Sequence, residues 1–334
     1  MKVWMKRLLC AAAAAAAGIC ALAALSQGAA GGTKQGGERD EVTAAPVRIG
    51  FSETDSSNPW RVAQQTSLIN AAADRGFRFL FEEPKERTAQ WQLQNIREML
   101  DAGMDYLVVI PASETALGEI IEMVKETGTK LILMECSTWD VDPEDYLFMI
   151  CTDYYKEGQL CAQILHSRYQ EEPVSILEVA GEEGSTVAGQ RAAGFRDEIL
   201  KYPNMKISGQ ILGSFDRVTA QKSMEEMLAG EPYYYNAIVA YSDEDGLGVL
   251  QALKVAGKAD GSVPIISING VQDALKAIIA GEYYATVESS PEVGPLIMQL
   301  IGSNEKGYAP AKQVFIPYNI FDRDNVLEQY KNAY

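Results

Sequence analysis

The sequence predicts an α/β protein of two three-layer lobes, each built on a parallel β-sheet that helices cover on both faces. Short apolar runs alternate with amphipathic stretches from residue 47 onward, which is typical of strands alternating with helices. The eleven apolar runs are too many for one simple doubly wound domain. The runs at 130–135 and 146–151 leave no room for a helix between them, so a seam is expected near 150–155.

The strands are expected where apolar runs are short and bounded by polar or glycine-rich segments. They are 47–52, 78–83, 106–111, 130–135 and 146–151, followed by 174–180, 206–212, 236–242, 263–268, 284–290 and 313–318. Four of the helical stretches between them end on a glycine at the stop position: Gly103, Gly128, Gly257 and Gly281. A TIM barrel is the alternative fold, but the connections near 136–146 and 303–312 break its repeat.

The N-terminus has the pattern of an export signal. Three basic residues precede an apolar run at 8–25, and no acidic residue occurs before Glu38. This predicts a signal peptide over residues 1–30. An uncleaved membrane anchor is one alternative. Lipid attachment at Cys20 is another, although Ile19 is bulkier than the small residue such a site prefers.

The remaining composition limits the partners. Residues 31–46 are rich in glycine and charge and are expected to form a flexible linker. The net charge of −17 argues against nucleic-acid binding, which requires neutralising phosphates. Beyond the predicted signal, Cys136, Cys151 and Cys161 show no C-x-x-C spacing, so they indicate neither a zinc site nor a disulfide framework, and one pair is left open.

Candidate ligand contacts follow from the rule that open parallel sheets bind ligands beyond the carboxyl ends of their strands. Hydroxyls, carboxylates, amides, arginines and one tryptophan occur there, at 52–61, 111–114, 135–137, 153, 181–191, 242–245, 269 and 288–290. Paired polar groups bind sugar hydroxyls, and an aromatic face suits the apolar side of a sugar ring. The set therefore favours a neutral polyhydroxylated ligand.

Motifs for other chemistry are incomplete. The glycine-rich stretch at 179–195 lacks both G-x-G-x-x-G and the P-loop lysine, and "DEDGLG" lacks the residue order of a calcium loop. The lone His166 lies within a helical pattern and completes no catalytic triad or metal cluster. Glu135 and Asp153 are paired carboxylates of the kind glycosidases use, but no barrel or sandwich accompanies them. We therefore expect a binding protein with no enzymatic activity, cofactor or metal.

Several segments together resemble a known family. They are "VRIGFSETDSSNPWR" (47–61), "AAADRGF" (71–77), "DAGMDYLVVIPASETAL" (101–117), "GQRAAGF" (189–195), "SDEDGLGVLQALKVAG" (242–257) and "SINGVQDALKAIIAGEYYATVESSPEVGP" (267–295). They are similar to the periplasmic sugar-binding proteins of ABC transporters, and more narrowly to the galactofuranose and pentose binders. The resemblance runs in order from about residue 45 to 330.

The resemblance implies a type I periplasmic-binding fold, in which two Rossmann-like lobes joined by three crossovers enclose a sugar by hinge motion. The crossovers are expected near 151–153, 287–289 and 316–318. The N-terminal lobe would comprise 47–152 plus 288–316, and the C-terminal lobe 153–287 plus 317–334.

The resemblance also implies a monomer outside the cytoplasmic membrane, periplasmic or on the cell surface, that delivers its sugar to a membrane permease. A binding protein that presents its ligand to a chemoreceptor or sensor kinase is the alternative. A LacI-like regulator shares the fold but requires an N-terminal helix-turn-helix, where this chain has the predicted signal.

Carried over by position, the resemblance assigns stacking on the sugar to Trp60. The other implied contacts are Ser52, Asn58, Arg61, Glu135, Asp153, Arg191, Phe215, Ser242, Asp243, Asn269 and Glu288. Three positions depart from the family pattern. Glu135-Cys136 replaces a frequent Asp-Arg, which implies a lost bidentate clamp and a thiol in the cleft. Ser242 replaces an Asn, and Asn269 replaces an Asp.

Overall fold

The computed structural model describes residues 45–56, 59–136, 139–230 and 234–333. The predicted signal peptide, the possible lipid site at Cys20, nearly all of the predicted linker, and Asn58 therefore lie outside the described residues. Among the residues that are described, none of the helices has the length and apolar character needed to cross a membrane.

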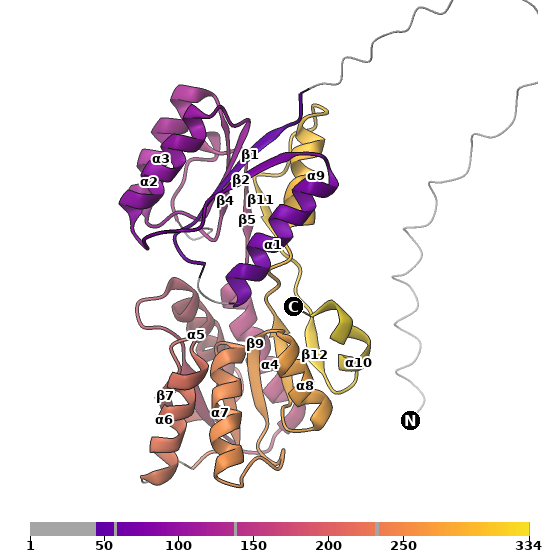
Figure 1. Cartoon of the computed structure of the whole chain (residues 1–334). Coiled ribbons are helices and arrows are strands. Elements are labelled where there is room, and N and C mark those ends of the chain that lie inside the picture. The colour runs from indigo at the N-terminus through magenta and orange to yellow at the C-terminus, as the bar shows by residue number, and fades with distance from the viewer. Residues whose placement is uncertain (1–44, 57–58, 137–138, 231–233, 334) are drawn as a thin grey trace, which may run out of the picture. The chain divides into compact units, whose positions relative to one another are not determined.

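The first sheet has six parallel strands in the order β11-β5-β4-β3-β1-β2 (Figure 1). Its strands are β1 (Arg48–Ser52), β2 (Arg78–Phe81), β3 (Tyr106–Val109), β4 (Lys130–Met134), β5 (Phe148–Cys151) and β11 (Gln313–Phe315). One face packs on α1 (Pro59–Asp74) and α9 (Gly294–Asn304), and the other on α2 (Ala89–Asp101) and α3 (Glu114–Thr127). We call this unit the first lobe.

The second sheet also has six strands, in the order β12-β10-β9-β8-β6-β7, and only β12 runs antiparallel to its neighbour. Its strands are β6 (Val174–Ala180), β7 (Met205–Leu212), β8 (Ala237–Ala240), β9 (Ile265–Asn269), β10 (Ala285–Glu288) and β12 (Ile320–Asp322).

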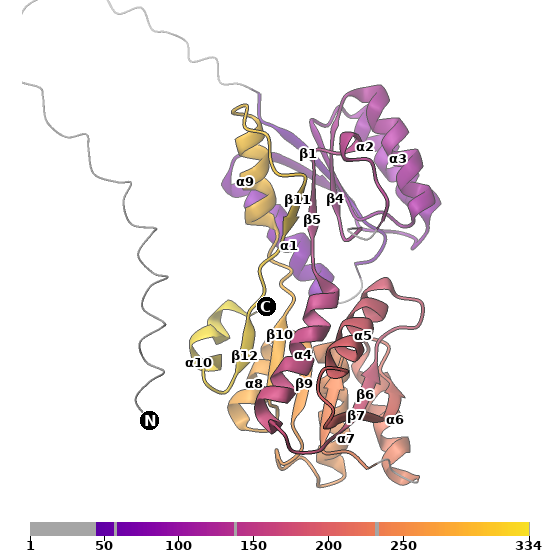
Figure 2. The same cartoon turned by 180° about the vertical axis from the view of Figure 1, so that it is seen from behind.

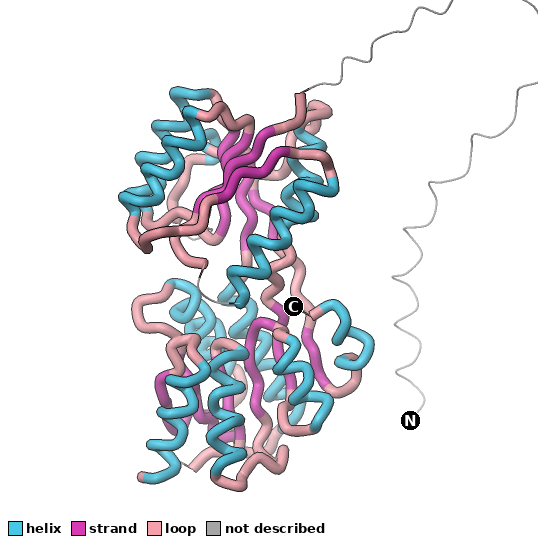
Figure 3. The backbone as a smooth tube through the Cα atoms, in the orientation of Figure 1, coloured by secondary structure: helices cyan, strands magenta, loops and turns pink. Residues whose placement is uncertain are grey.

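Helices cover both faces of the second sheet, and we call this unit the second lobe (Figure 3). On one face lie α4 (Tyr154–Tyr169) and α5 (Thr186–Ile199). On the other lie α6 (Arg217–Ala229), α7 (Asp243–Val255), α8 (Gln272–Ala280) and α10 (Val326–Gln329). Short 3-10 turns occupy Pro143–Asp145 and Tyr330–Asn332.

The continuous apolar runs form strands because each strand is buried on both faces. Along β3, Leu107 and Val109 enter the core under α2 and α3, whereas Tyr106 and Val108 enter the core under α1 and α9. All four side chains are fully buried. Side chains alternate across a strand, so a strand between two helical layers has to be apolar at every position.

The chain passes between the two sheets three times (Figure 2). It leaves the first sheet after β5, returns to it after β10, and leaves it again between β11 and β12. The predicted fold class, two three-layer lobes with parallel sheets, is confirmed, and two open sheets exclude the barrel. The strand β12 was missed because its three residues form no apolar run.

The four helix stops predicted at glycine are confirmed. Gly128 and Gly281 are left-handed C-caps with φ of 72° and 79°. Gly103 and Gly257 follow their C-caps by one residue with φ of 76° and 69°. Each helix ends where its chain needs a positive φ that glycine adopts without steric cost.

Candidate ligand-binding site

A pocket of about 230 Å³ lies where the carboxyl ends of strands from both lobes meet. Seven of the predicted contact residues line it: Trp60, Arg61, Glu135, Arg191, Phe215, Ser242 and Asn269. Nine further residues complete the lining: Asp55, Pro59, Tyr154, Glu182, Ser185, Val187, Glu244, Val271 and Ser289. This placement is the one expected for ligands of open parallel sheets.

Trp60 lies in the first turn of α1 and is tied to the crossover that follows β10. Its Nε1–H donates a hydrogen bond of 2.7 Å to the backbone oxygen of Ser289. The Arg61 guanidinium carbon lies 5.2 Å from the centre of the Trp60 ring. Because the only polar atom of the indole bonds the protein, the ring has only apolar surface to offer the pocket.

Arg61 and Glu135 form a bidentate ion pair at the first-lobe wall. Arg61 Nη1 donates to Glu135 Oε1, and Nη2 donates to Oε2 at 2.7 Å. Gln64 Nε2 donates to the same Oε1 at 3.2 Å. The two charged side chains are 20% and 12% exposed. The structure thus holds the Glu135 carboxylate through Arg61 of α1, although no arginine follows Glu135 in the sequence.

Cys136 does not reach the pocket, contrary to the expectation of a thiol in the cleft. Glu135 has a φ of 60°, and after this left-handed residue Cys136 lies in the core under α2 and α3, fully buried. Burial raises the pKa of the Cys136 thiol to about 12, so it is a neutral packing residue. Cys151 and Cys161 are also buried free thiols.

Arg191 and Glu157 form a second ion pair, behind the second-lobe wall. Arg191 Nε donates to Glu157 Oε2 at 2.8 Å, and Nη1 donates to the backbone oxygen of Tyr241 at 2.7 Å. The side chains are only 4% and 1% exposed. Burial raises the pKa of Glu157, and the Arg191 charge opposes that rise. The guanidinium also lies 5.5 Å from the ring centre of Tyr154, another lining residue.

The position of Arg191 is fixed by a close helix crossing between α4 and α5. A Cβ at Gly158 would lie 2.0 Å from the backbone oxygen of Arg191, and one at Gly194 would lie 1.9 Å from that of Tyr155. The two helices therefore touch backbone to backbone. This gives Gly194, in the glycine-rich stretch 179–195, a packing role in place of a phosphate-binding one.

Phe215 also belongs to the second-lobe wall and depends on an unusual backbone. Ser214 and Phe215 both have a positive φ, 60° and 57°. The ring packs directly on Gly181, where a Cβ would lie only 2.4 Å from a ring carbon. Ser242 lines the pocket, and its hydroxyl also caps α7 by accepting a hydrogen bond from Asp245 N at 3.1 Å.

Comparison with known proteins places the chain in a family. The family model described as "Periplasmic binding protein domain" matches residues 49–301. The chain belongs to the periplasmic binding protein family. The resemblance seen in the sequence is thereby confirmed.

Relatives and solved structures agree with this assignment. The chain is 28% identical over 290 residues to the galactofuranose-binding protein YtfQ of Escherichia coli, covering 86% of this chain and 91% of that one. It is 23% identical to the ribose import binding protein RbsB of Bacillus subtilis, covering 81% and 86%.

Among solved structures, a galactofuranose binding protein has a TM-score of 0.77 at 26% identity, covering 86% of this chain and 98% of that one. The arabinose ABC transporter's periplasmic component from Shewanella sp. ANA-3, bound to arabinofuranose, has a TM-score of 0.76 at 29% identity, covering 86% and 95%.

Four predicted contacts of this periplasmic binding protein lie away from the pocket lining. Ser52 is 1% exposed, and its hydroxyl donates to Asn95 Oδ1 at 2.8 Å, so it holds α2 against β1. Asp153 is exposed and caps α4, accepting from Lys156 N at 2.8 Å. Both belong to the structure around the crossovers and strand ends, and we leave them out of the proposed contact set.

The carboxylates of Asp243 and Glu288 also accept hydrogen bonds from other residues of the protein. Asp243 is fully buried and accepts from Thr286 Oγ1 at 2.7 Å and from two backbone N–H groups at the start of the α8 loop. Glu288 accepts from Asn319 Nδ2 and lines a separate hollow behind the crossover. The adjacent Ser289 lines the pocket instead, since neighbouring residues of an extended chain point to opposite sides.

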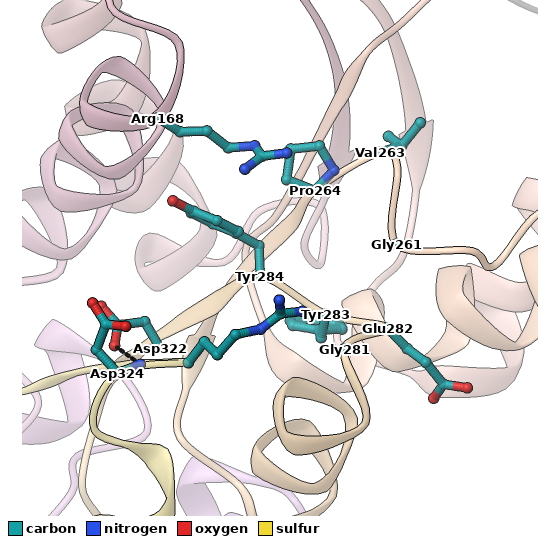
Figure 4. A pocket seen from close by; sticks show the side chains of 11 residues that line it. Arg168, Gly261, Val263, Pro264, Gly281, Glu282, Tyr283, Tyr284, Asp322 and Asp324 are labelled. Atoms are coloured by element: carbon teal, nitrogen blue, oxygen red, sulfur yellow. Dashed lines mark hydrogen bonds between the residues drawn. The ribbon is translucent and has the colours of Figure 1, made fainter.

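A second hollow, of about 310 Å³, occupies the opposite edge of the second sheet (Figure 4). Most of its residues precede β9 and β10, at the amino ends of these strands, and the others come from the last turn of α4 and from the end of β12. Figure 4 shows Arg168 beside Pro264 and above Tyr284, and its guanidinium carbon is 4.8 Å from the Tyr284 ring centre. Parallel sheets bind ligands at the other edge, which favours the pocket between the lobes.

The pocket lining combines paired charges, polar groups and aromatic rings. Across the described ranges, no group of three or more His, Cys, Asp or Glu side chains is placed to hold a metal ion. Both pocket arginines are already paired with glutamates, so the walls present hydrogen-bonding groups and little net positive charge. The arrangement suits recognition of hydroxyl groups around an apolar ring face.

Proposed function

We propose that this chain is an extracytoplasmic solute-binding protein that captures a neutral monosaccharide and delivers it to the permease of an ABC transporter. The observation that carries the proposal is the convergence of an anchored Trp60 ring and the two glutamate-paired arginines, Arg61 and Arg191, on one pocket of about 230 Å³. That volume is below the range typical of drug-sized ligands and suits a single sugar.

The proposed binding mode uses each wall differently. The sugar's apolar face lies on Trp60, with Phe215 on the second-lobe side, while its hydroxyls bond Arg61 and Glu135 on one wall and Arg191 and nearby polar groups on the other. A ligand that touches both lobes favours the closed arrangement because only then are both sets of contacts made. No catalytic step is needed, and we propose none.

The relatives support a proposal for the class of sugar. The galactofuranose-binding protein and the arabinofuranose-bound structure are similar along most of this chain, so galactofuranose, a pentose or a related hexose is the proposed ligand. The ribose relative is named as an import binding protein, and we therefore propose import rather than presentation to a sensor kinase or chemoreceptor. We further propose that the protein acts as a monomer.

Isothermal titration calorimetry against L-arabinose, D-ribose, D-galactose, D-fructose and myo-inositol tests the proposal. We expect one or more of these to bind, and Trp60→Ala and Arg191→Ala to abolish measurable binding. Tyr308→Ala, which changes an aromatic side chain that is 70% exposed and outside the pocket, should bind as the unmodified protein does. Failure of the whole panel, or unchanged affinity in both pocket variants, would contradict the proposal.

Mass spectrometry of the ligand retained through purification supplies an independent identification. We expect a neutral monosaccharide. A retained anionic sugar or a peptide would contradict the proposed class of ligand.

A further inference from the structure

Glu53 is a buried carboxyl directly behind the first-lobe wall of the pocket. It follows the last residue of β1 and is 1% exposed. Its Oε1 accepts a hydrogen bond from Gln65 of α1, while Oε2 is buried with no hydrogen-bond partner in the described part of the chain. Buried polar atoms are nearly always partnered, so an unpartnered carboxyl oxygen calls for a physical explanation.

The charges that face Glu53 come from three places. Arg61 faces it from α1, Glu135 from the end of β4, and Asp55 from its own loop. Arg61 is already held by both oxygens of Glu135, so an ionised Glu53 adds a further negative charge beside a guanidinium that Glu135 already neutralises. Burial raises the pKa of Glu53 from 4.5 to about 7, while Arg61 and the Gln65 hydrogen bond oppose the rise.

We propose that Glu53 is a positioning residue that is protonated when a monosaccharide occupies the pocket, so that sugar affinity falls as the pH rises. The inference rests on the proposed function. When Glu53 is neutral, Arg61 pairs with Glu135 alone. The bidentate geometry of this pair is then kept, and both side chains are presented to the ligand. An ionised Glu53 competes with Glu135 for the same guanidinium.

The direction of the effect follows from desolvation. A sugar in the pocket replaces water beside Arg61 and Glu135, and less water near Glu53 disfavours its charged form further. The liganded protein therefore holds the proton more tightly than the free protein, and by linkage binding takes up protons and weakens with rising pH. A difference of about one pKa unit between the two states corresponds to about a tenfold loss of affinity.

The test measures dissociation constants from pH 5.5 to 8.5, using the tightest-binding sugar of the panel above. Calorimetry in two buffers of different ionisation enthalpy gives the number of protons taken up. We expect the unmodified protein to lose about tenfold in affinity across this range, with proton uptake above pH 7. Glu53→Gln, which keeps the shape but cannot ionise, should bind at all pH values as the unmodified protein does at pH 5.5.

Two control variants separate the contribution of Glu53 to the pH dependence from the contributions of other carboxyl groups. Asp245, in the second lobe, is also fully buried, and burial raises its pKa to about 8, so Asp245→Asn tests the competing source of pH dependence. Glu119→Gln changes an exposed carboxyl on α3. We expect both to keep the pH slope of the unmodified protein.

A pH slope that survives in Glu53→Gln, or that disappears in Asp245→Asn, would overturn the inference, as would an unmodified protein whose affinity does not change with pH. A purely structural role for Glu53 would shift the melting temperature without altering proton uptake, and this result would also overturn it. Absence of sugar binding at every pH is a separate outcome, which would contradict the proposed function itself.

Discussion

The two arginine–glutamate pairs at the pocket look alike in composition but differ in burial and support. Arg61–Glu135 is bidentate and remains 20% and 12% exposed, joining a helix to a strand end. Arg191–Glu157 is only 4% and 1% exposed, and its guanidinium also bonds a backbone oxygen across a glycine-mediated helix crossing. From this difference we expect the first-lobe wall to adjust more readily to a ligand than the second-lobe wall, whose arginine has more contacts with the protein.

Neutralising one carboxylate in each pair should destabilise the protein most where the pair is more deeply buried. Glu157→Gln leaves the Arg191 charge buried without a counter-ion and should cost about 3 kcal/mol of unfolding free energy. Glu135→Gln, in the more exposed pair, should cost less, because the Arg61 guanidinium keeps partial contact with water. Urea denaturation of the two variants gives both values. Equal losses would show that the pairs do not differ in the way their burial indicates.

The next prediction concerns Glu53, which lies beside the Arg61–Glu135 pair. Replacing it should change the unfolding free energy by an amount that depends on pH. Its folded-state pKa of about 7 lies above its unfolded value of 4.5, so the folded protein holds the proton more tightly. Stability is therefore lost as the pH rises through this window, by up to about 3 kcal/mol above pH 8. Glu53→Gln should be more stable than the unmodified protein by about this amount at pH 8.5 and equally stable near pH 4.

Denaturation curves of both proteins at the two pH values provide the measurement. Taking the difference between variant and unmodified protein removes the contribution of the other carboxyls. A difference that does not change with pH would show that Glu53 ionises at its ordinary value.

The smallest expected effect concerns the Trp60 anchor, which ties the first-lobe wall to the crossover. Trp60→Phe keeps an aromatic ring but leaves the Ser289 carbonyl, in a residue that is 4% exposed, without its 2.7 Å donor. We expect a loss of about 1 kcal/mol in stability and a several-fold loss in sugar affinity. Thermal unfolding and calorimetry measure both. Unchanged values would show that the hydrogen bond does not position the ring.

The fold was predictable because it depends on patterns that the sequence displays. Strands buried on both faces are apolar throughout, and helix ends carry glycine where a positive φ is needed. The strand β12 was not predicted, because its pairing with β10 is decided by tertiary contacts and not by its own three residues. Strand-end chemistry and family resemblance together located the pocket's two arginines and its tryptophan.

The details of the site depended on backbone geometry that no residue pattern displays. The left-handed conformation of Glu135 places Cys136 in the core, and strand alternation gives the pocket Ser289 in place of Glu288. Ser52 and Asp243 were expected as contacts, but both are buried and fully engaged with the protein. A polar residue near a strand end can contact a ligand or hydrogen-bond within the protein, and the direction in which its side chain faces decides which.

The contact between Phe215 and Gly181 makes the size of the pocket sensitive to a residue that does not line it. A methyl group at position 181 would overlap the ring, so a side chain there would force Phe215, a residue of the pocket lining, to move. Exchanging one hydrogen atom behind this aromatic wall is therefore expected to change the shape of the pocket without replacing any of its hydrogen-bonding groups.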